Sequence, residues 1–365
     1  MNVLLLDQFS ELGGAQRMLL DLLPAISDRG WTAALAAPPG ELCDRTRALG
    51  FCAVPILCGP YSSGRKSAAD LWRFAFETPR MARRIRELAA QFNPGLVYIN
   101  GPRLLPAAAL ARLTPPVLFH AHIGVSQTPA RRLAGEALRR LDADVVAVCR
   151  SVSEAWQPFV RKPVSVIYNG VAGPKAAVNH NAARPPLIGC IGRISPEKGQ
   201  RAFLDAAARI HAALPESRFV IAGSALFSDS AAQAYEREVR DAATALPVEF
   251  TGWTDDIDSV LARLHLLLVP SMWDEPNPRV ILEAFAAGVP VIAFRRGGIP
   301  EMIQHGETGL LCDNPREMAE QAIELLRDRG RLCAIAQAAR ENWQCQFTRE
   351  HWQQQMIAAL ERVVA

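Results

Sequence analysis

The sequence predicts an α/β protein made of two doubly wound domains, because short apolar runs alternate with amphipathic, helix-like stretches along its 365 residues. Runs of four or five apolar residues are typical of strands that a parallel sheet buries on both faces. The chain is longer than one ordinary domain, and half of its residues are apolar, so two domains can each bury a core. A polar, turn-rich stretch at residues 172–186 is the predicted linker between domains 1–171 and 187–345.

The first predicted strand, Val3–Leu6, leads into a glycine loop at Gly13 and Gly14 and then into an amphipathic helix that ends near Asp28. This arrangement can bind phosphate, because glycines let backbone N–H groups approach an anion and the helix dipole favours it. A glycine pair is also common in tight turns, so both interpretations stay open. The loop lacks the Gly-x-Gly-x-x-Gly fingerprint of dinucleotide binding, which argues against a nicotinamide-dependent enzyme.

Further strands of the first domain are predicted from apolar runs, and polar residues follow their ends. The predicted strands are Thr32–Ala36, Leu96–Ile99, Val117–Phe119, Val145–Val148 and, within Val164–Val171, a strand that ends in the turn Asn169-Gly170. Ligands of doubly wound sheets bind beyond the carboxyl ends of the strands, where this chain carries Asn100, His120 and His122. The two histidines are candidates for a zinc site, for packing or surface positions, or for the lining of an active site. No third metal ligand stands at a suitable spacing.

The second domain is predicted to open with strand Leu187–Ile191 and the loop Gly192–Gly199. That loop carries one arginine, Arg193, and one lysine, Lys198, ahead of a helix from about Gln200. Arg193 can chelate phosphate oxygens in a bidentate way, and Lys198 adds a compact charge. The loop therefore suits a diphosphate.

Two more strands, Phe219–Ala222 and Val248–Thr251, are predicted to end beside the ligand of the second domain. Three acidic residues that follow them imitate a metal-binding motif: Asp255, Asp256 and Asp258. We interpret them as the start of a helix that runs to Leu264, since carboxylates are favourable in a first helical turn. No obligatory metal is expected.

A strand at Leu266–Val269 and a loop precede the central helix, predicted at Pro278–Ala287 with Asn277 as its N-cap and Gly288 after its end. This helix is apolar nearly all round except at Glu283. A helix of that kind is buried, and a buried carboxylate needs a partner.

Glu275 stands eight residues before Glu283, in the loop at the positive end of the same helix. Two carboxylates beside a helix tip rich in N–H donors suit a polyhydroxylated ligand with negative charge. Carboxylates accept from hydroxyl groups, and the helix tip binds an anion. A plainer interpretation is that Glu275 is a solvated loop residue and that Glu283 pairs with a structural arginine.

Four of these motifs together resemble the retaining glycosyltransferases of family 4, and the resemblance covers most of the chain. The segments that carry it are Gly13-Gly14-Ala15, Gly192–Gly199, Pro270–Pro276 and Val280–Ala284. The resemblance implies a fold of GT-B type, in which two Rossmann-like doubly wound domains face each other across a cleft.

The resemblance also implies roles for individual residues. The catalytic candidates are Glu275, which would contact the donor sugar, and a histidine near the reacting sugar, with His122 favoured over His120. Glu283 would hold the ribose of the nucleotide. The other expected donor-binding residues are Gly13, Gly14, Arg193, Lys198, Asn277, Arg279 and Val280. The two cations and the helix tip would stabilise charge on the departing diphosphate.

The predicted function is the transfer of a sugar from a UDP- or GDP-sugar to a glycan or lipid-linked acceptor, in polysaccharide or glycolipid synthesis, with the retention that the resemblance implies. No metal or other cofactor is expected. Two alternatives stay open: a nucleotide-sugar epimerase of the same fold, and a non-catalytic subunit that binds sugar nucleotides. The family often has an aromatic residue and a glycine where this chain has Asn277 and Pro278, so the preferred donor also stays open.

Charge is unevenly divided, since residues 1–171 carry 20 Lys and Arg against 13 Asp and Glu, whereas residues 172–365 carry 20 against 24. Arginines cluster on two predicted helices of the first domain, at Arg80–Arg86 and Arg131–Arg140. These are either solvated helix faces or a surface for an anionic membrane. They lack the interleaved aromatic residues that would suggest nucleic-acid binding.

We predict a cytoplasmic protein with peripheral contact to the membrane face. The sequence shows neither a signal peptide nor a membrane span, and its eight cysteines are scattered without zinc-like spacing. By the resemblance, a C-terminal helix at about residues 346–365 is expected to pack back onto the first domain.

Overall fold

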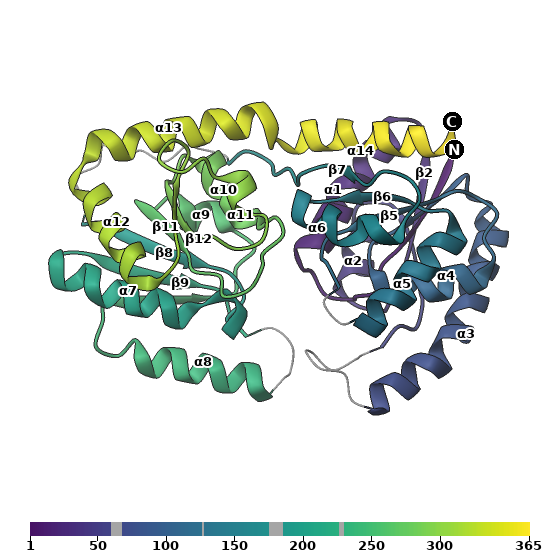
Figure 1. Ribbon diagram of the computed structural model, residues 1–365, viewed down its shortest axis with the longest axis horizontal. Helices are drawn as coiled ribbons and strands as arrows, with labels where there is room; N and C mark the ends of the chain where they lie inside the picture. Colours follow the sequence, from purple (N-terminus) through teal and green to yellow (C-terminus); the bar gives the residue numbers. More distant parts are fainter. Residues whose placement is uncertain (60–67, 126–127, 175–184, 226–229) are drawn as a thin grey trace. The chain divides into compact units, whose positions relative to one another are not determined.

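The computed structural model describes residues 1–59, 68–125, 128–174, 185–225 and 230–365. These residues form two compact units: unit 1 consists of Met1–Asn169 and Glu350–Ala365, and unit 2 of Gly170–Arg349 (Figure 1). Most of the predicted linker, residues 175–184, lies outside the described residues. Each unit contains one parallel sheet with helices, which confirms the predicted α/β fold class.

Unit 1 contains a seven-stranded sheet in the order β3-β2-β1-β4-β5-β6-β7, in which every neighbouring pair is parallel. Its strands are β1 Asn2–Leu6, β2 Thr32–Ala37, β3 Cys52–Pro55, β4 Leu96–Ile99, β5 Val117–Ala121, β6 Asp144–Ala147 and β7 Ser165–Val166. The strand order reverses between β1 and β4, and such a reversal is where ligands of doubly wound sheets bind.

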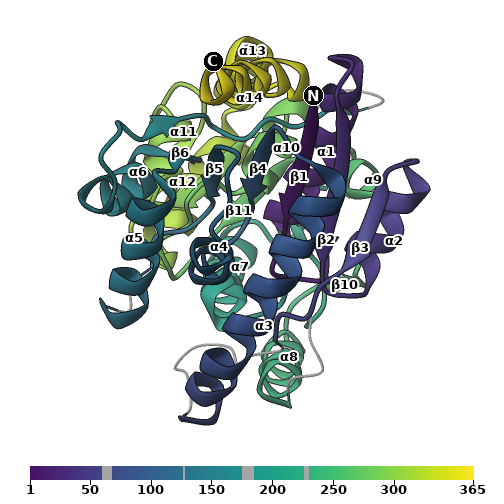
Figure 2. The same ribbon diagram turned by 90° about the vertical axis from the view of Figure 1, so that its right-hand side faces the viewer.

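Helices cover both faces of this sheet (Figures 1 and 2). They are α1 Gly14–Asp28, α2 Glu41–Ala48, α3 Ala68–Phe92, α4 Leu105–Ala111, α5 Thr128–Leu141, α6 Arg150–Trp156 and α14 Arg349–Val364, with 3₁₀ turns η1 Pro102–Leu104 and η2 Gln157–Phe159. Alternate residues of β1 belong to different layers, because successive side chains of a strand point to opposite faces. Leu4 and Leu6 pack with α3, α4 and α5, whereas Val3 and Leu5 pack with α1, α2 and α14.

One strand was missed by the sequence predictions, and two predicted elements have the wrong bounds. Strand β3 was not predicted, because Cys52–Pro55 is short and only partly buried at the sheet edge. The predicted strand from Val164 to the Asn169-Gly170 turn is only two residues long, as β7, and Val171 forms a bridge with Thr348 in unit 2. The predicted helix to Leu264 ends at Leu261, although Asp256 does begin it, by accepting a hydrogen bond from the Ser259 N–H at 3.2 Å.

Unit 2 contains a six-stranded sheet in the order β10-β9-β8-β11-β12-β13, again with parallel pairs throughout. Its strands are β8 Leu187–Ile191, β9 Arg218–Ala222, β10 Val248–Gly252, β11 Leu266–Val269, β12 Val291–Phe294 and β13 Leu310–Cys312. Its helices are α7 Gln200–Ala213, α8 Ser230–Ala242, α9 Ile257–Leu261, α10 Arg279–Ala287, α11 Ile299–Met302, α12 Pro315–Arg327 and α13 Arg329–Gln346, with a 3₁₀ turn η3 Pro196–Lys198. The reversal of strand order falls between β8 and β11.

The tryptophan-rich end of the chain is divided between the units. Trp343 of α13 stays with unit 2, where its indole N–H donates to the Val171 carbonyl at 3.2 Å. Trp352 of α14 is 1 % exposed and belongs to the apolar core of unit 1, together with Met356 and Leu360. Within the described part of the chain, no helix has the length and apolar character needed to span a membrane.

Candidate functional site

The loop after β8 in unit 2 is held by two glycines that approach neighbouring backbone. Gly199 has φ +72°, and a Cβ there would lie 1.9 Å from the Pro270 carbonyl oxygen. A Cβ at Gly223, after β9, would lie 2.0 Å from the Gly192 carbonyl oxygen. The Met272 N–H also donates to the Glu197 carbonyl at 2.8 Å. The loop is therefore fixed against the ends of β9 and β11, and only glycine permits this at these two positions.

Lys198 and Glu275 meet at the reversal of strand order in unit 2. The Lys198 ammonium contacts Oε1 of Glu275, and the Ser271 hydroxyl donates to the same oxygen at 3.1 Å. Glu275 is 4 % exposed, so it is not a solvated loop residue. The structure therefore brings together the carboxylate and the lysine that the sequence assigned to the donor site.

The Glu275 loop is fixed from a third side by the segment after β12. A Cβ at Gly297 would lie 2.4 Å from the Glu275 carbonyl oxygen, and the Gly298 N–H donates to that oxygen at 2.8 Å. The Gly297 N–H donates to the Asp274 carboxylate at 3.2 Å. Backbone contacts thus define the position of Glu275 independently of any ligand.

The start of the central helix differs from the prediction. The N-cap of α10 is Pro278 rather than Asn277, because Pro278 has an extended ψ of 115° and the helix begins at Arg279. The Asn277 side chain is buried beside this helix tip, whereas Val280 in the first turn is partly exposed.

Glu283 is less buried than the apolar pattern of the helix predicts. Its side chain is 24 % exposed, and Oε1 lies 3.5 Å from Nε of Arg279 one turn earlier. This is the arginine pairing that the plainer interpretation expected. Arg279 and Glu283 therefore share one face of α10.

In unit 1, one buried carboxylate collects hydrogen bonds at the corresponding reversal of strand order. Asp7 follows β1 and is completely buried. The Gln16 amide donates to both of its oxygens at 3.0 and 3.1 Å, and the Asn100 amide donates to Oδ2 at 2.5 Å. The Phe9 N–H donates to Oδ1 at 2.8 Å. Burial raises the pKa of Asp7 to about 6. The hydrogen bonds lower this pKa, but their effect is smaller than that of burial.

The glycine loop of unit 1 joins the same network. Gly13 is the N-cap of α1, and its N–H donates to Oε1 of Gln16 at 3.2 Å. Gly14 begins the helix. The loop is therefore tied to Asp7 through Gln16, which the sequence analysis did not single out.

The two histidines occupy different environments at the end of β5. His120 is completely buried, and its Nδ1 lies 2.5 Å from the Tyr98 hydroxyl. His122 is partly exposed, and its Nε2 lies 2.8 Å from Oδ1 of Asn100. The ring centroids are 4.0 Å apart. Burial lowers the pKa of His120 well below its usual value and that of His122 to about 3, so both rings are neutral near pH 7.

Sequence reasoning missed Asp7, Gln16 and Ser271. Asp7 carries a usable signal, since a charged residue directly after a fully apolar strand stands where parallel sheets bind ligands. Gln16 and Ser271 carry none, because their partners are set by the fold. Among the described residues, no group of three or more His, Cys, Asp or Glu side chains is arranged to hold a metal ion.

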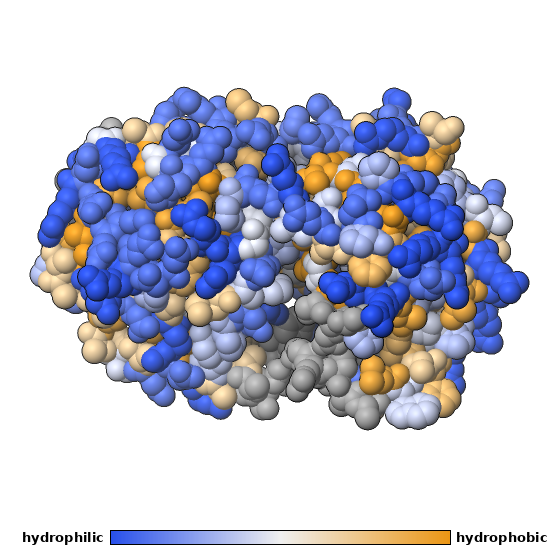
Figure 3. Space-filling view, in the orientation of Figure 1, coloured by the Kyte–Doolittle hydropathy of each residue, from blue (hydrophilic) through white to orange (hydrophobic). Residues whose placement is uncertain are grey.

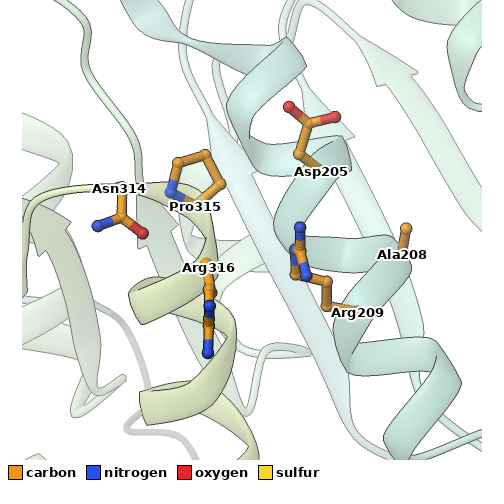
Figure 4. Close-up of a pocket in the computed structure, with 6 residues that line it drawn as sticks. All are labelled: Asp205, Ala208, Arg209, Asn314, Pro315 and Arg316. Carbon is orange, nitrogen blue, oxygen red and sulfur yellow. The ribbon is translucent and has the colours of Figure 1, made fainter.

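A surface pocket of about 410 Å³ lies elsewhere in unit 2, between α7 and the start of α12 (Figure 4). None of the predicted site residues lines it. Asn314 accepts a hydrogen bond from the Glu317 N–H at 3.0 Å as the cap of α12, and Arg316 pairs with Glu320 at 2.8 Å. These side chains already stabilise α12, so we assign no ligand to this pocket.

Comparison with known proteins gives two family models that match consecutive parts of the chain. The model for Glycosyltransferase Family 4 matches residues 12–172, and the model for glycosyl transferases group 1 matches residues 185–328. The putative glycosyltransferase YtcC of Bacillus subtilis is 33 % identical over 169 residues, which are 44 % of this chain and 41 % of that protein.

One further relative extends this comparison. The GDP-mannose-dependent α-(1-6)-phosphatidylinositol monomannoside mannosyltransferase of Mycobacterium tuberculosis is 34 % identical over 43 % of this chain and 42 % of that enzyme. The matches to this mannosyltransferase and to YtcC thus span less than half the length of each relative.

Anabaena HepE matches over the whole length. Its complex with UDP has a TM-score of 0.85 at 24 % identity, and its complex with UDP-glucose has 0.82 at 25 %; each covers 99 % of this chain and 100 % of that one. The two sheets therefore have the GT-B fold. Because the two glycosyltransferase models together match both units in sequence, the chain belongs to the glycosyltransferases of family 4.

Proposed function

We propose that the protein transfers a hexosyl group from a nucleoside diphosphate-sugar to a glycan or lipid-linked acceptor, with retention of anomeric configuration. The observation that carries the proposal is the contact between Lys198 and the buried Glu275, on loops held by backbone contacts. HepE was crystallised with UDP-glucose, and the mycobacterial relative is GDP-mannose-dependent. UDP- and GDP-sugars are therefore the donors to test first.

In the proposed mechanism, unit 2 holds the donor. Arg193 and Lys198 balance the negative charge that grows on the departing diphosphate, which stabilises the transition state more than the ground state. Among the described residues, the Glu275 side chain forms hydrogen bonds only through Oε1. Its Oε2 can then accept from a hydroxyl of the sugar. No metal is needed in this scheme, so turnover is expected to survive EDTA.

The test compares Glu275→Gln with Lys198→Gln, and uses Glu249→Gln as a control because Glu249 is exposed and paired with Arg263 in the same unit. Release of UDP or GDP is measured with and without a panel of glycan and lipid-linked acceptors, and nucleotide binding by calorimetry. We expect Glu275→Gln to lower turnover by about 100-fold while nucleotide affinity stays nearly constant. Lys198→Gln is expected to weaken nucleotide binding about tenfold.

The outcomes separate the alternatives. Wild-type turnover in Glu275→Gln rejects the assigned role. Release of nucleotide only with an acceptor supports a transferase. Conversion of the donor to its epimer without release indicates an epimerase, and binding without any turnover indicates a non-catalytic subunit. The anomeric configuration of the product, read by NMR, tests retention.

We also propose that unit 1 contacts an anionic membrane through α3, as a cytoplasmic peripheral protein. Three large apolar side chains near the start of α3 are mostly exposed: Leu71 at 61 %, Trp72 at 67 % and Phe76 at 65 %. Hydrophobic residues gather there in Figure 3, at the lower right where Figure 1 places α3. Exposed arginines follow on the same helix, at Arg80 and Arg83. Aromatic residues beside arginines suit a bilayer of anionic lipid.

Sedimentation with lipid vesicles tests this contact. We expect binding to phosphatidylglycerol vesicles, weaker binding to phosphatidylcholine, and a loss of about tenfold in Trp72→Ala/Phe76→Ala. Trp253→Ala is the control, since Trp253 is 44 % exposed but belongs to unit 2. Equal binding by both variants removes α3 from the proposal.

A further inference from the structure

Asp7 is the acceptor in all of its side-chain hydrogen bonds. This determines which atoms of the neighbouring amide side chains donate and which accept. An ionised carboxylate can only accept, so the amide groups that face it must present nitrogen. Gln16 therefore donates through Nε2 to Asp7 and keeps Oε1 for the Gly13 N–H. Asn100 donates through Nδ2 to Oδ2 of Asp7 at 2.5 Å and to the Ala15 carbonyl at 3.3 Å.

The orientation of Asn100 decides which nitrogen of His122 carries the proton. With Nδ2 turned to two acceptors, Oδ1 of Asn100 is the atom that lies 2.8 Å from Nε2 of His122. An amide oxygen only accepts, so Nε2 must be protonated. Because a neutral imidazole carries one proton, Nδ1 is left as an acceptor.

Nδ1 of His122 is also the nitrogen that is not committed within the protein. In the described part of the chain, the only hydrogen bond of the His122 ring runs through Nε2. The side chain is partly exposed, unlike that of His120, which is completely buried against Tyr98. Of the two histidines, His122 is therefore the one that can meet a ligand, and it offers an acceptor to it.

We propose that Asp7 is a positioning residue which, through Asn100, holds His122 as the Nε2–H tautomer so that Nδ1 accepts a hydrogen bond from a hydroxyl of the bound sugar or acceptor. The ligand in this statement rests on the proposed function, whereas the tautomer does not. A structural role alone would require Asp7 to satisfy its neighbours but would not require any particular tautomer of His122.

Asp7→Asn separates these possibilities. Oδ1 of the new amide keeps the bonds from Phe9 and Gln16, so its nitrogen faces Asn100. Asn100 then has to turn its oxygen toward that nitrogen and its own nitrogen toward His122. We expect the proton of His122 to move to Nδ1 in this variant.

Asn100→Asp is the matched variant that preserves the direction of the bonds. Two carboxyl groups this close share one proton, so the new residue donates to Asp7 and still accepts from His122. We expect the Nε2–H tautomer to persist. The two variants each change one side chain of the Asp7–Asn100 contact. We therefore expect Asp7→Asn to change the tautomer of His122 and Asn100→Asp to preserve it.

The measurement is two-bond ¹H–¹⁵N NMR of the full chain labelled on histidine, at pH 7.5, with the His122 signals assigned by their loss in His122→Gln. The buried His120 serves as an internal reference. An Nδ1–H ring in the wild type overturns the inference, whatever the activity of the enzyme. An unchanged tautomer in Asp7→Asn overturns the role of Asp7.

Kinetics test the second half of the inference. With the donor identified above, kcat/KM of Asp7→Asn is expected to fall about tenfold while UDP or GDP affinity in calorimetry stays constant. Asn100→Asp should retain more of the activity than Asp7→Asn. If NMR confirms the predicted tautomers but kcat/KM of Asp7→Asn is unchanged, the proposed contact of Nδ1 with a hydroxyl group is rejected. The role of Asp7 in setting the tautomer is then retained. Absence of turnover in the wild type refutes the proposed function and leaves the NMR result standing.

Discussion

Units 1 and 2 place polar residues at the same topological position and stabilise them differently. In each unit, a residue that follows the first strand contacts a residue that follows the neighbouring strand, at the point where the strand order reverses. These residues are Asp7 and Asn100 in unit 1, and Lys198 and Glu275 in unit 2. Unit 1 holds its group by side-chain hydrogen bonds around one carboxylate. Unit 2 holds opposite charges on loops fixed by glycine and backbone contacts.

The difference teaches that one sheet topology can serve two kinds of ligand. A cationic loop with an adjacent carboxylate suits a diphosphate linked to a sugar. A hydrogen-bonded network with an uncommitted imidazole nitrogen suits hydroxyl groups. Four predictions test how far this comparison of the units holds, from the largest expected effect to the smallest.

The largest effect is expected from Trp352→Ala in α14. The side chain is 1 % exposed in the core of unit 1, so its removal should cost about 3–5 kcal/mol of the stability of that unit. Hydrogen exchange by mass spectrometry should show lost protection in residues 1–169 and unchanged protection in unit 2. Equal loss in both units would show that they unfold together. Trp253→Ala, at an exposed site, is the control.

Next comes the substitution of Gly199, with Gly288 as a closely matched control. The two glycines have almost the same backbone angles, φ +72° and ψ 32° against φ +73° and ψ 30°. A Cβ at Gly288 meets nothing within 4 Å, whereas one at Gly199 meets the Pro270 carbonyl at 1.9 Å. We expect Gly288→Ala to cost about 1 kcal/mol, and Gly199→Ala to cost about 3 kcal/mol or more. Chemical denaturation followed in unit 2 measures both.

The third prediction concerns acid. The folded pKa of His122, about 3, lies below the ordinary 6.5, so between these values the unfolded chain binds more protons and stability falls as the pH falls. His120 acts in the same direction. The pKa of Asp7 is raised from 3.8 to about 6, so between these two values the folded chain binds more protons and Asp7 increases stability as the pH falls. The two histidines should outweigh it.

The acid effect should therefore appear as a loss of stability in unit 1 between pH 6.5 and 4. Hydrogen exchange at several pH values measures it, with His122→Gln as the variant that flattens the dependence. A stability of unit 1 that rises toward pH 4 would mean that Asp7 dominates.

The smallest effect is expected at the surface of unit 1. Arg29 pairs with Glu361 of α14 at 2.6 Å, but the side chains are 58 % and 38 % exposed. Exposed pairs contribute little because water and salt screen them. Glu361→Gln should therefore cost less than about 1 kcal/mol, and its effect should vanish at high salt. A loss comparable to that of Trp352→Ala would show that the ion pair, and not the buried face, holds α14.

Most of the fold could be predicted because it follows from local patterns. Apolar runs marked nearly all strands, and Gly288 marked the end of α10. The exceptions carried weak signals. Strand β3 is short and partly buried, and Pro278 took the cap position expected for Asn277 because its own backbone is extended.

The site was only partly predictable. Glu275 and Lys198 stand in recognisable motifs, and the fold brings them into contact across 77 residues. The partners of Asp7 could not be foreseen, since Asn100 lies 93 residues away and neither residue belongs to a motif. Which amide faces which carboxylate depends on strand order and register, and these follow from packing of the whole sheet.

The close approach of Gly199 to Pro270 has a consequence for exchanging loops of unit 2 between related proteins. Because the segments 192–199 and 270–275 touch through main-chain atoms, neither can be lengthened, shortened or exchanged for that of a homologue without displacing the other. Recombination between related enzymes should then preserve function only when both segments come from the same parent.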